Sequence, residues 1–528
     1  MPTSHGTLFA PLLFILSLGN VLINSKMFSR SRMRLPVILS IFLSGLIVSP
    51  LEALAQIADN PPYIVRSPSN YNSFLPPPVG DTYPDPVFST TVKRLSDATK
   101  LLGSSGNVNS LVGNEYASIN AINADSSLVY FPIGLGGKRL YSINGGLANV
   151  PSPDLSFNGT GPLSLQMRWS RTDPNILYYV APEVMYYTGP DVPGPSYIRS
   201  INVKTGEIKT LHTFPQYANL YLTSADLSPD GDYIPILANG RYAFWYRIST
   251  DTVGPIIDRT SSAWGFAVGA KGGMQVVGDR FTMFNYASPA YPFGLLVLDR
   301  DSMTLVSTVF QYNTRPGVIT QIDHAAFGLD ADGSPIVIMP YSGYTNCQAS
   351  PWYVPGYGGV IQAAKWNLRV GTNTNLGCIP TRINVTDFYF SLPAIYTGWT
   401  LVTLVDIVGD PSPTGGNPAP QPGWLPMENE LFLLKLDGSG QVKRLVHHRG
   451  RSSDFTTNPS TEPYGARPKA SLNMDGSKAV FGSNYNFVNP TPTGDVNYQD
   501  AYLVNITVGA ALPSGTALPS PTNLTVSP

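Results

Sequence analysis

A polar turn followed by a short apolar strand recurs along the chain, and this repeat limits the folds that the chain can adopt. Clear copies of the turn lie at residues 228–231, 330–333 and 473–476, with looser copies at 123–126, 171–174 and 271–273. The clear copies end in Asp-Gly, which accepts the positive φ of tight hairpin turns. A supersecondary unit repeated at intervals indicates small sheets stacked on one another. The repeat therefore predicts an array of antiparallel sheets.

A second element, a strand–turn–strand with alternating apolar residues, follows each turn. It occurs at 140–150, 197–214, 243–258, 295–310, 362–379 and 430–447. A seventh begins with a strand at 501–506, whose partner is missing on the C-terminal side. The strand at 91–95 is an orphan with the same Lys-Arg-Leu ending as 443–445.

Pairing these two strands would remove two exposed sheet edges. We therefore expect an all-β fold, a single β-propeller of seven four-stranded blades closed by residues 91–95 pairing in the last blade. One blade, at 388–407, lacks the Asp-Gly turn. Six or eight blades are the alternatives.

Composition agrees with this fold class and excludes one class of partner. The 49 Gly and 49 Pro in 528 residues favour short strands and tight turns over helices. The formal net charge of −1 provides no basic field for nucleic acid.

Residues 1–55 have the pattern of a leader. Arg30, Arg32 and Arg34 precede the apolar run 35–48, and the Ala53-Leu54-Ala55 sequence suits a signal peptidase. We expect export, with cleavage near Ala55. The alternative is a retained membrane anchor at 8–23, and Met27 or Met33 would be conventional start positions.

The rest of the chain divides into a Pro-rich extended lead-in (56–86), the propeller (87–510) and a tail (511–528). The tail is either a linker or disordered end, or the start of a fibronectin type III-like domain. Cys347 and Cys378 would form a disulfide in an oxidising compartment, worth about 3 kcal/mol; two buried thiols are the alternative.

Two longer stretches carry a resemblance to a known family. Residues 85–95 (DPVFSTTVKRL) and 467–476 (RPKASLNMDG) resemble secreted bacterial TolB-like propellers related to oligogalacturonate lyase. The resemblance implies β-elimination of uronate chains, with a histidine base and a divalent metal held by histidines and a glutamine. Gln321 and His324 match two of these metal ligands, but Ala326 stands where the last ligand would be.

Two groups of residues are candidate site residues. His324 and His448 are the candidate catalytic residues. For ligand binding we single out His447, Arg449, Arg451, Tyr464 and Arg467, because imidazole and guanidinium groups suit an anionic glycan. Trp352 and Tyr357 lie in a Pro/Gly loop where they could stack on sugar rings. The alternatives are a solvated strand end for the basic run, loop aromatics that fold back over a blade, and a structural role for His324.

We therefore expect a secreted propeller that binds extracellular polysaccharide or a surface protein through one face, or serves as a scaffold. A uronate lyase or hydrolase is the rival function. It requires His324 and one of His447 or His448 to lie close together.

Overall fold

The structure is a computed structural model that describes part of the chain. The described residues are 57–59, 64–66, 68, 74–100, 111–133, 137–151, 153, 155, 166–181, 194–222, 226–266, 273–285, 294–309, 324–341, 359–381, 388–404, 426–450, 467–485 and 498–507. The chain divides into two compact units, residues 1–52 and 53–528, and all described residues belong to the second. The leader, the tail from residue 511 and Cys347 lie outside the described residues.

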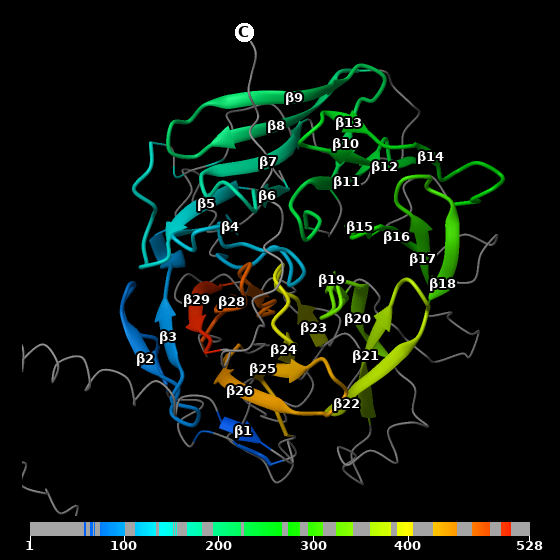
Figure 1. The fold of residues 1–528 in the computed structure, drawn as a ribbon. Coiled ribbons are helices and arrows are strands. Elements are labelled where there is room, and N and C mark those ends of the chain that lie inside the picture. Colours follow the sequence, from blue (N-terminus) through cyan, green and yellow to red (C-terminus); the bar gives the residue numbers. More distant parts are fainter. Residues whose placement is uncertain are drawn as a thin grey trace, which may run out of the picture. The chain divides into compact units, whose positions relative to one another are not determined.

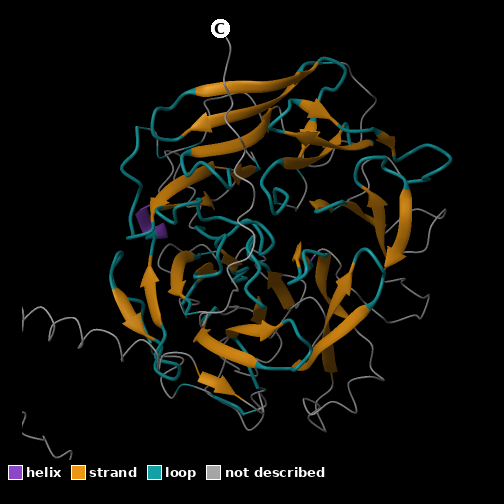
Figure 2. Cartoon of the chain, viewed as in Figure 1, coloured by secondary structure: helices purple, strands orange, loops and turns teal. Residues whose placement is uncertain are grey.

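The described residues are all-β and form seven antiparallel sheets, which we call sheets I to VII (Figures 1 and 2). Helix among them is limited to 3₁₀ turns, one at Ala98–Lys100 and one that includes His324. Sheet I contains β4 (Leu128–Ile133) and β5 (Gly137–Ser142). Sheet II contains β6 (Met167–Trp169), β7 (Ile176–Ala181), β8 (Ser196–Asn202) and β9 (Ile208–Phe214). Sheet III contains β10 (Leu220–Tyr221), β11 (Tyr233–Ala238), β12 (Tyr242–Arg247), β13 (Thr252–Val253) and β14 (Ile257–Asp258).

The other four sheets follow in chain order. Sheet IV contains β15 (Met274–Val277), β16 (Arg280–Asn285), β17 (Gly294–Asp299) and β18 (Leu305–Val309). Sheet V contains β19 (Ala326–Leu329), β20 (Pro335–Tyr341), β21 (Gly359–Asn367) and β22 (Asn373–Thr381). Sheet VI contains β23 (Phe388–Ser391), β24 (Trp399–Leu404), β25 (Glu430–Lys435), β26 (Val442–His447) and β1 (Ile57–Asp59). Sheet VII contains β27 (Ser471–Leu472), β28 (Lys478–Ser483), β29 (Asp500–Asn505), β3 (Thr91–Arg94) and β2 (Thr82–Pro84).

Alternation along the strands gives each sheet two buried faces. In β17, Leu296 and Leu298 pack into a core shared with sheet III, whereas Leu295 and Val297 pack into a core shared with sheet V. Successive side chains of a strand point to opposite faces, so an uninterrupted apolar run fills two cores.

Seven apolar cores lie between seven pairs of sheets. They join I to II, II to III, III to IV, IV to V, V to VI, VI to VII, and finally VII to I. In Figure 1 the sheets follow one another in this order, with β6, β15, β19 and β23 toward the centre.

Sheet VII joins the two ends of the folded region. Strand β3 pairs with β29 in the register Tyr502↔Arg94 and Val504↔Val92, as expected for residues 91–95. The Arg94 guanidinium lies 2.6 Å from Asp500 Oδ2, and Asp500 also accepts hydrogen bonds from Ser96 Oγ and the Ala98 amide.

The recurrent turns contact one another in sequence. Asn473 Nδ2 donates to Ser126 Oγ (3.0 Å), Asn123 Nδ2 to the Pro174 carbonyl (2.9 Å), and Arg171 Nε to the Ser228 carbonyl (2.9 Å). These bonds link the turns of sheets VII, I, II and III. The repeated turn therefore also bridges neighbouring sheets, a role that its hairpin geometry alone does not predict.

The structure differs from the expected repeat in two respects. Strand number varies, because sheets III, VI and VII contain five strands and sheet I contains two among the described residues. In sheet IV the turn equivalent to Asp-Gly follows β15 at Gly278, whose φ is +56°, instead of preceding it at 271–273.

The lead-in contributes strands to two sheets. β1 pairs antiparallel with β26, and β2 pairs antiparallel with β3. No helix among the described residues is long and apolar enough to cross a membrane.

Candidate ligand-binding site at the centre of the sheets

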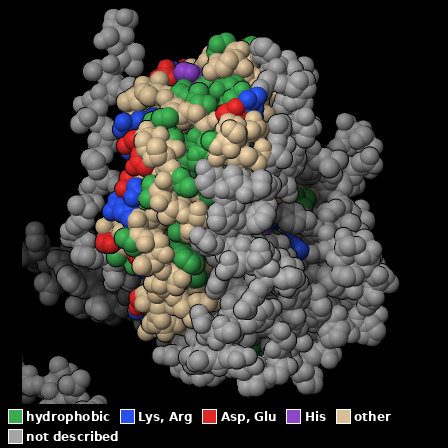
Figure 3. Space-filling model, turned by 90° about the vertical axis from the view of Figure 1, so that its right-hand side faces the viewer, with side chains coloured by type: hydrophobic (Ala, Val, Ile, Leu, Met, Phe, Trp, Pro, Cys, Tyr) green, Lys and Arg blue, Asp and Glu red, His purple; other side chains and the backbone are tan. Residues whose placement is uncertain are grey.

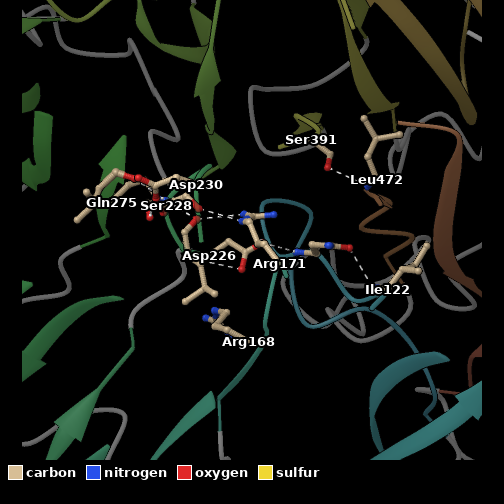
Figure 4. Close-up of polar contacts among 12 residues, drawn as sticks. Ile122, Arg168, Arg171, Asp226, Ser228, Asp230, Gln275, Ser391 and Leu472 are labelled. Carbon is tan, nitrogen blue, oxygen red and sulfur yellow. Dashed lines mark hydrogen bonds and ion pairs between the residues drawn. The ribbon is translucent and has the colours of Figure 1, made fainter. Parts of the chain in front are cut away.

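A pocket lies where the innermost segments of six sheets meet. Its lining is Ser118, Arg171, Asp226, Leu227, Pro229, Gln275, Phe327, Leu392, Pro393 and Ala394. These residues come in turn from sheets I to VI, so the pocket marks the centre around which the sheets are arranged. Figure 4 shows Arg171, Asp226 and Gln275 around this region, with Arg168 nearby.

Arg171 is held at the pocket by three acceptors of sheet III. Nε donates to the Ser228 carbonyl (2.9 Å), and Nη2 donates to Asp226 Oδ2 (3.1 Å) and to the Leu227 carbonyl (3.0 Å). Asp226 also accepts the amide hydrogens of Asn120 and Leu227. Both charged groups are therefore held in place by backbone hydrogen bonds as well as by each other.

A second set of residues, which we call the cationic layer, surrounds the Glu115 carboxylate. It consists of Glu115, Lys138, Arg168, Arg467 and Lys469. Lys138 Nζ lies 2.8 Å from Glu115 Oε2, and Arg168 Nη1 lies 3.5 Å from Glu115 Oε1. The layer thus contains four basic side chains and one acidic side chain, a composition that suits an anionic ligand.

Burial sets the protonation of the cationic layer. Burial, together with the nearby Arg467 and Lys138 charges, lowers the pKa of Lys469 to about 8, although Glu115 opposes this shift. An anion bound here would stabilise the charged form of Lys469.

An aromatic group borders the cationic layer. The rings of His324 and Tyr389 stack with centroids 4.2 Å apart, and Tyr116 packs edge-on to both. Arg467 Nη1 donates to the Tyr389 hydroxyl (3.1 Å). The structure thus brings together two of the residues singled out in the sequence, His324 and Arg467.

His324 is neutral, and one of its two ring nitrogens is hydrogen-bonded. Nδ1 donates to the Phe388 carbonyl at 2.7 Å, so Nε2 carries the lone pair. Burial lowers the pKa of His324 to about 3, and the Arg467 and Lys469 charges contribute to the shift.

His448 lies near the same end of sheet VI, and both of its ring nitrogens are hydrogen-bonded. Its Nε2 donates to the Leu404 carbonyl (2.9 Å), and Leu404 is the cross-strand partner of Phe388. Nδ1 accepts the Gly450 amide hydrogen (3.0 Å), and burial lowers the pKa of His448 to about 3. Both ring nitrogens therefore make hydrogen bonds within the protein.

His447 and Arg449 are buried and contact the lead-in. His447 Nε2 donates to the Arg66 carbonyl (2.7 Å), and its ring stacks on Phe88 with centroids 4.9 Å apart. The Arg449 guanidinium lies over the Phe74 ring at 4.4 Å. His447, His448 and Arg449 are therefore not a solvated strand end, because all three are buried.

The described residues do not fit a divalent metal. They contain no group of three or more His, Cys, Asp or Glu side chains placed to hold a cation. His324 lies beside Arg467 and Lys469, whose charges oppose a metal ion as they oppose a proton. Gln321, the other expected ligand, lies outside the described residues, as do Trp352, Tyr357, Arg451 and Tyr464. We therefore derive no step through a metal.

Sequence reasoning missed Lys138, Arg168, Arg171, Asp226 and Lys469. A signal for the centre was present in the repeat, because His324 and Arg467 each precede a turn aspartate, Asp332 or Asp475, by eight residues. The same spacing does not locate the five residues that were missed, because they lie at other distances from their turn aspartates.

Taken together, the all-β sheets, the cores between successive sheets and the central pocket define a protein of propeller type. No protein-family model matches the chain, and no curated protein matches it. Among solved structures, it is similar to an oligogalacturonate lyase in complex with manganese, with 12% identity and a TM-score of 0.47 over 81% of this chain and 96% of that one.

Two further solved structures are similar to the chain. The oligogalacturonate lyase of Vibrio parahaemolyticus is 12% identical, with a TM-score of 0.47 over 80% of this chain and 96% of that one. TolB from Acinetobacter baumannii is 13% identical, with a TM-score of 0.29 over 63% of each chain. These solved structures are of the kinds of propeller protein that the sequence resembles.

Proposed function

We propose that this chain is an exported, seven-bladed β-propeller that binds a carboxylate-bearing extracellular polysaccharide at its centre. The observation that carries the proposal is the pairing of Lys138 and Arg168 with Glu115, with Arg467 and Lys469 nearby, beside the Tyr116, His324 and Tyr389 rings. Guanidinium and ammonium groups recognise carboxylates, and aromatic faces pack against sugar rings.

The seven-blade count is supported by the seven cores. Each core joins successive sheets, and the last joins sheet VII to sheet I, as a closed ring requires. The β3–β29 pairing supports closure by the N-terminal strand.

Export is supported by residues in two parts of the chain. Arg30, Arg32 and Arg34 precede an apolar run, and the proposed cleavage near Ala55 leaves the lead-in on the mature protein. Cys378 is disulfide-bonded, as expected, and the one other cysteine of the sequence is Cys347. Such a bond suits an oxidising compartment.

The test is calorimetric titration of the purified protein with polygalacturonate and, as a neutral polymer, dextran. We expect binding of polygalacturonate alone, weakening as salt is raised. Lys469→Met and Arg467→Gln should each weaken binding about tenfold or more, corresponding to about 1.4 kcal/mol or more. Lys204→Gln, which removes an exposed lysine elsewhere, should leave affinity unchanged. Equal binding of the two polymers would refute the proposal.

A uronate lyase remains the alternative because His324 Nε2 carries a lone pair beside Arg467 and Lys469. The lowered pKa makes His324 a weak base. Ultraviolet absorbance from an unsaturated uronate product, lost in His324→Ala, would favour the lyase over the binding protein.

A further inference from the structure

Two polar atoms in the central pocket make no hydrogen bond to the described residues. Among the described residues, Nη1 of Arg171 makes no hydrogen bond, although the other guanidinium nitrogens are bonded and the side chain is 9% exposed. Gln275 is 4% exposed and donates through Nε2 to the Leu227 (3.2 Å) and Val276 (3.1 Å) carbonyls, whereas its Oε1 accepts none from the described residues. Both side chains line the pocket.

Buried polar groups are normally hydrogen-bonded. A donor and an acceptor that lack hydrogen bonds in one pocket therefore indicate a ligand with the complementary groups. Arg171 requires an acceptor, and its positive charge favours a carboxylate. Gln275 Oε1 requires a hydroxyl or amine donor.

The rest of the lining sets the size and shape of the ligand. Phe327, Leu392, Pro393 and Ala394 form an apolar wall, half-buried at Phe327 and Leu392. The pocket is small and partly open to solvent, which favours a small ligand or the end of a longer one that enters from the mouth.

We propose that this pocket binds a small hydroxycarboxylate, with the carboxylate on Arg171, the hydroxyl on Gln275 Oε1, and the carbon skeleton against Phe327 and Leu392. The proposed polymer site uses the cationic layer, whereas this site uses none of those side chains. It therefore stands or falls independently of the proposed function. The ligand is either a free small acid or the acidic end of a saccharide chain.

The experiment is calorimetric titration of the full chain with matched probes. Lactate and galacturonate are the acids, propane-1,2-diol and galactose their neutral counterparts, and trigalacturonate the chain end. We expect each acid to bind about tenfold or more tightly than its neutral counterpart. In the Lys469→Met variant, whose polymer site is weakened, equal binding of galacturonate and trigalacturonate assigns a free acid, and tighter binding of trigalacturonate assigns a chain end. Binding of neither acid would overturn the proposal.

Leu392 supplies a matched pair of variants that leaves the hydrogen bonds of Arg171 and Gln275 in place. Leu392→Glu places a negative charge beside the bound carboxylate and should weaken acid binding about tenfold or more. Leu392→Gln has nearly the same shape without the charge and should change affinity by less than about threefold. Similar effects of the two variants would refute a carboxylate at this position. Lys469→Met should leave acid binding unchanged while it weakens polymer binding, which separates the two proposed sites.

Discussion

His447 Nδ1 lies 3.5 Å from Asp85 Oδ2, which joins the end of β26 to a lead-in residue 362 positions earlier in the chain. Both side chains are fully buried. Asp85 Oδ2 also accepts the His447 amide hydrogen (3.1 Å), while Oδ1 accepts those of Val87 and Phe88. The pair therefore fixes the lead-in against the end of β26 in sheet VI.

A second ion pair extends this contact. Arg444 donates through Nε to Glu430 Oε2 (2.7 Å) and through Nη1 to the Ile64 carbonyl (2.5 Å). Glu430 Oε1 lies 3.5 Å from His447 Nε2. Two acids and two bases thus share one buried site, where each charge depends on the others.

Loss of either partner should therefore be costly. We expect Asp85→Asn or His447→Gln to lower the free energy of unfolding by about 3–5 kcal/mol, because each leaves an uncompensated buried charge. Urea unfolding followed by tryptophan fluorescence measures this change. Limited proteolysis should cut the lead-in of these variants faster than that of the parent protein.

The His212–Asp251 pair provides a surface control for this prediction. Its atoms lie 2.7 Å apart, but the side chains are 27% and 60% exposed. We expect His212→Gln to cost less than about 1 kcal/mol. Comparable losses for His212→Gln and His447→Gln would show that burial of the Asp85 pair carries no special weight.

Stability should fall on both sides of neutral pH. Burial lowers the pKa of His447, but Asp85 and Glu430 outweigh it and raise this pKa to about 9. Above the unfolded value of about 6.5 the folded state binds the extra proton, so stability falls as pH rises from 6.5 to 8, by about 1.4 kcal/mol per unit. His324 and His448, with pKa values near 3, bind protons only when unfolded, so stability also falls as pH drops below 6.5.

Denaturant unfolding at half-unit pH intervals checks both arms. In His447→Gln the decline between pH 6.5 and 8 should vanish, while the acid arm remains. A decline that persists unchanged in this variant would assign it to another group.

The sequence predicted the sheets better than the site because the two depend on different kinds of information. Asp-Gly turns and apolar alternation are local, and they located β11, β20, β28 and the hairpins that follow them. The β3–β29 pairing could also be predicted, because the strand at 91–95 and the strand at 501–506 each lacked a partner in the repeat. The burial of His447 could not, because it depends on Asp85 and Phe88, far away in the chain. Likewise, Arg171 and Gln275 line the same pocket only because segments that are far apart in the chain surround it.

The joint between the chain ends should depend on the Arg94–Asp500 pair. Asp500 is fully buried and accepts hydrogen bonds from Arg94, Ser96, Ala98 and Tyr498. In Asp500→Asn the amide nitrogen cannot accept, so Arg94 loses its charged partner. We expect a loss of about 3 kcal/mol in urea unfolding.

The Arg369–Asp279 pair, which joins sheets IV and V with both side chains 44% exposed, is the control for that joint. Asp279→Asn should cost less than about 1 kcal/mol. An Asp500→Asn variant as stable as Asp279→Asn would mean that the β3–β29 joint does not rely on this ion pair.

Two glycines of the repeated turn should respond differently to the same substitution. Gly231 and Gly333 have nearly equal φ values of +78° and +76°, so alanine at either position carries the same backbone strain of about 1 kcal/mol. A Cβ at Gly333 meets nothing within 4 Å, whereas one at Gly231 would lie 2.8 Å from Arg171 Cβ. Gly231→Ala should therefore displace Arg171, cost about 1–3 kcal/mol more than Gly333→Ala, and weaken binding of a small acid at the pocket. Urea unfolding and calorimetric titration with lactate measure the two effects, and equal behaviour of the variants would show that Arg171 does not depend on the tight approach of this turn.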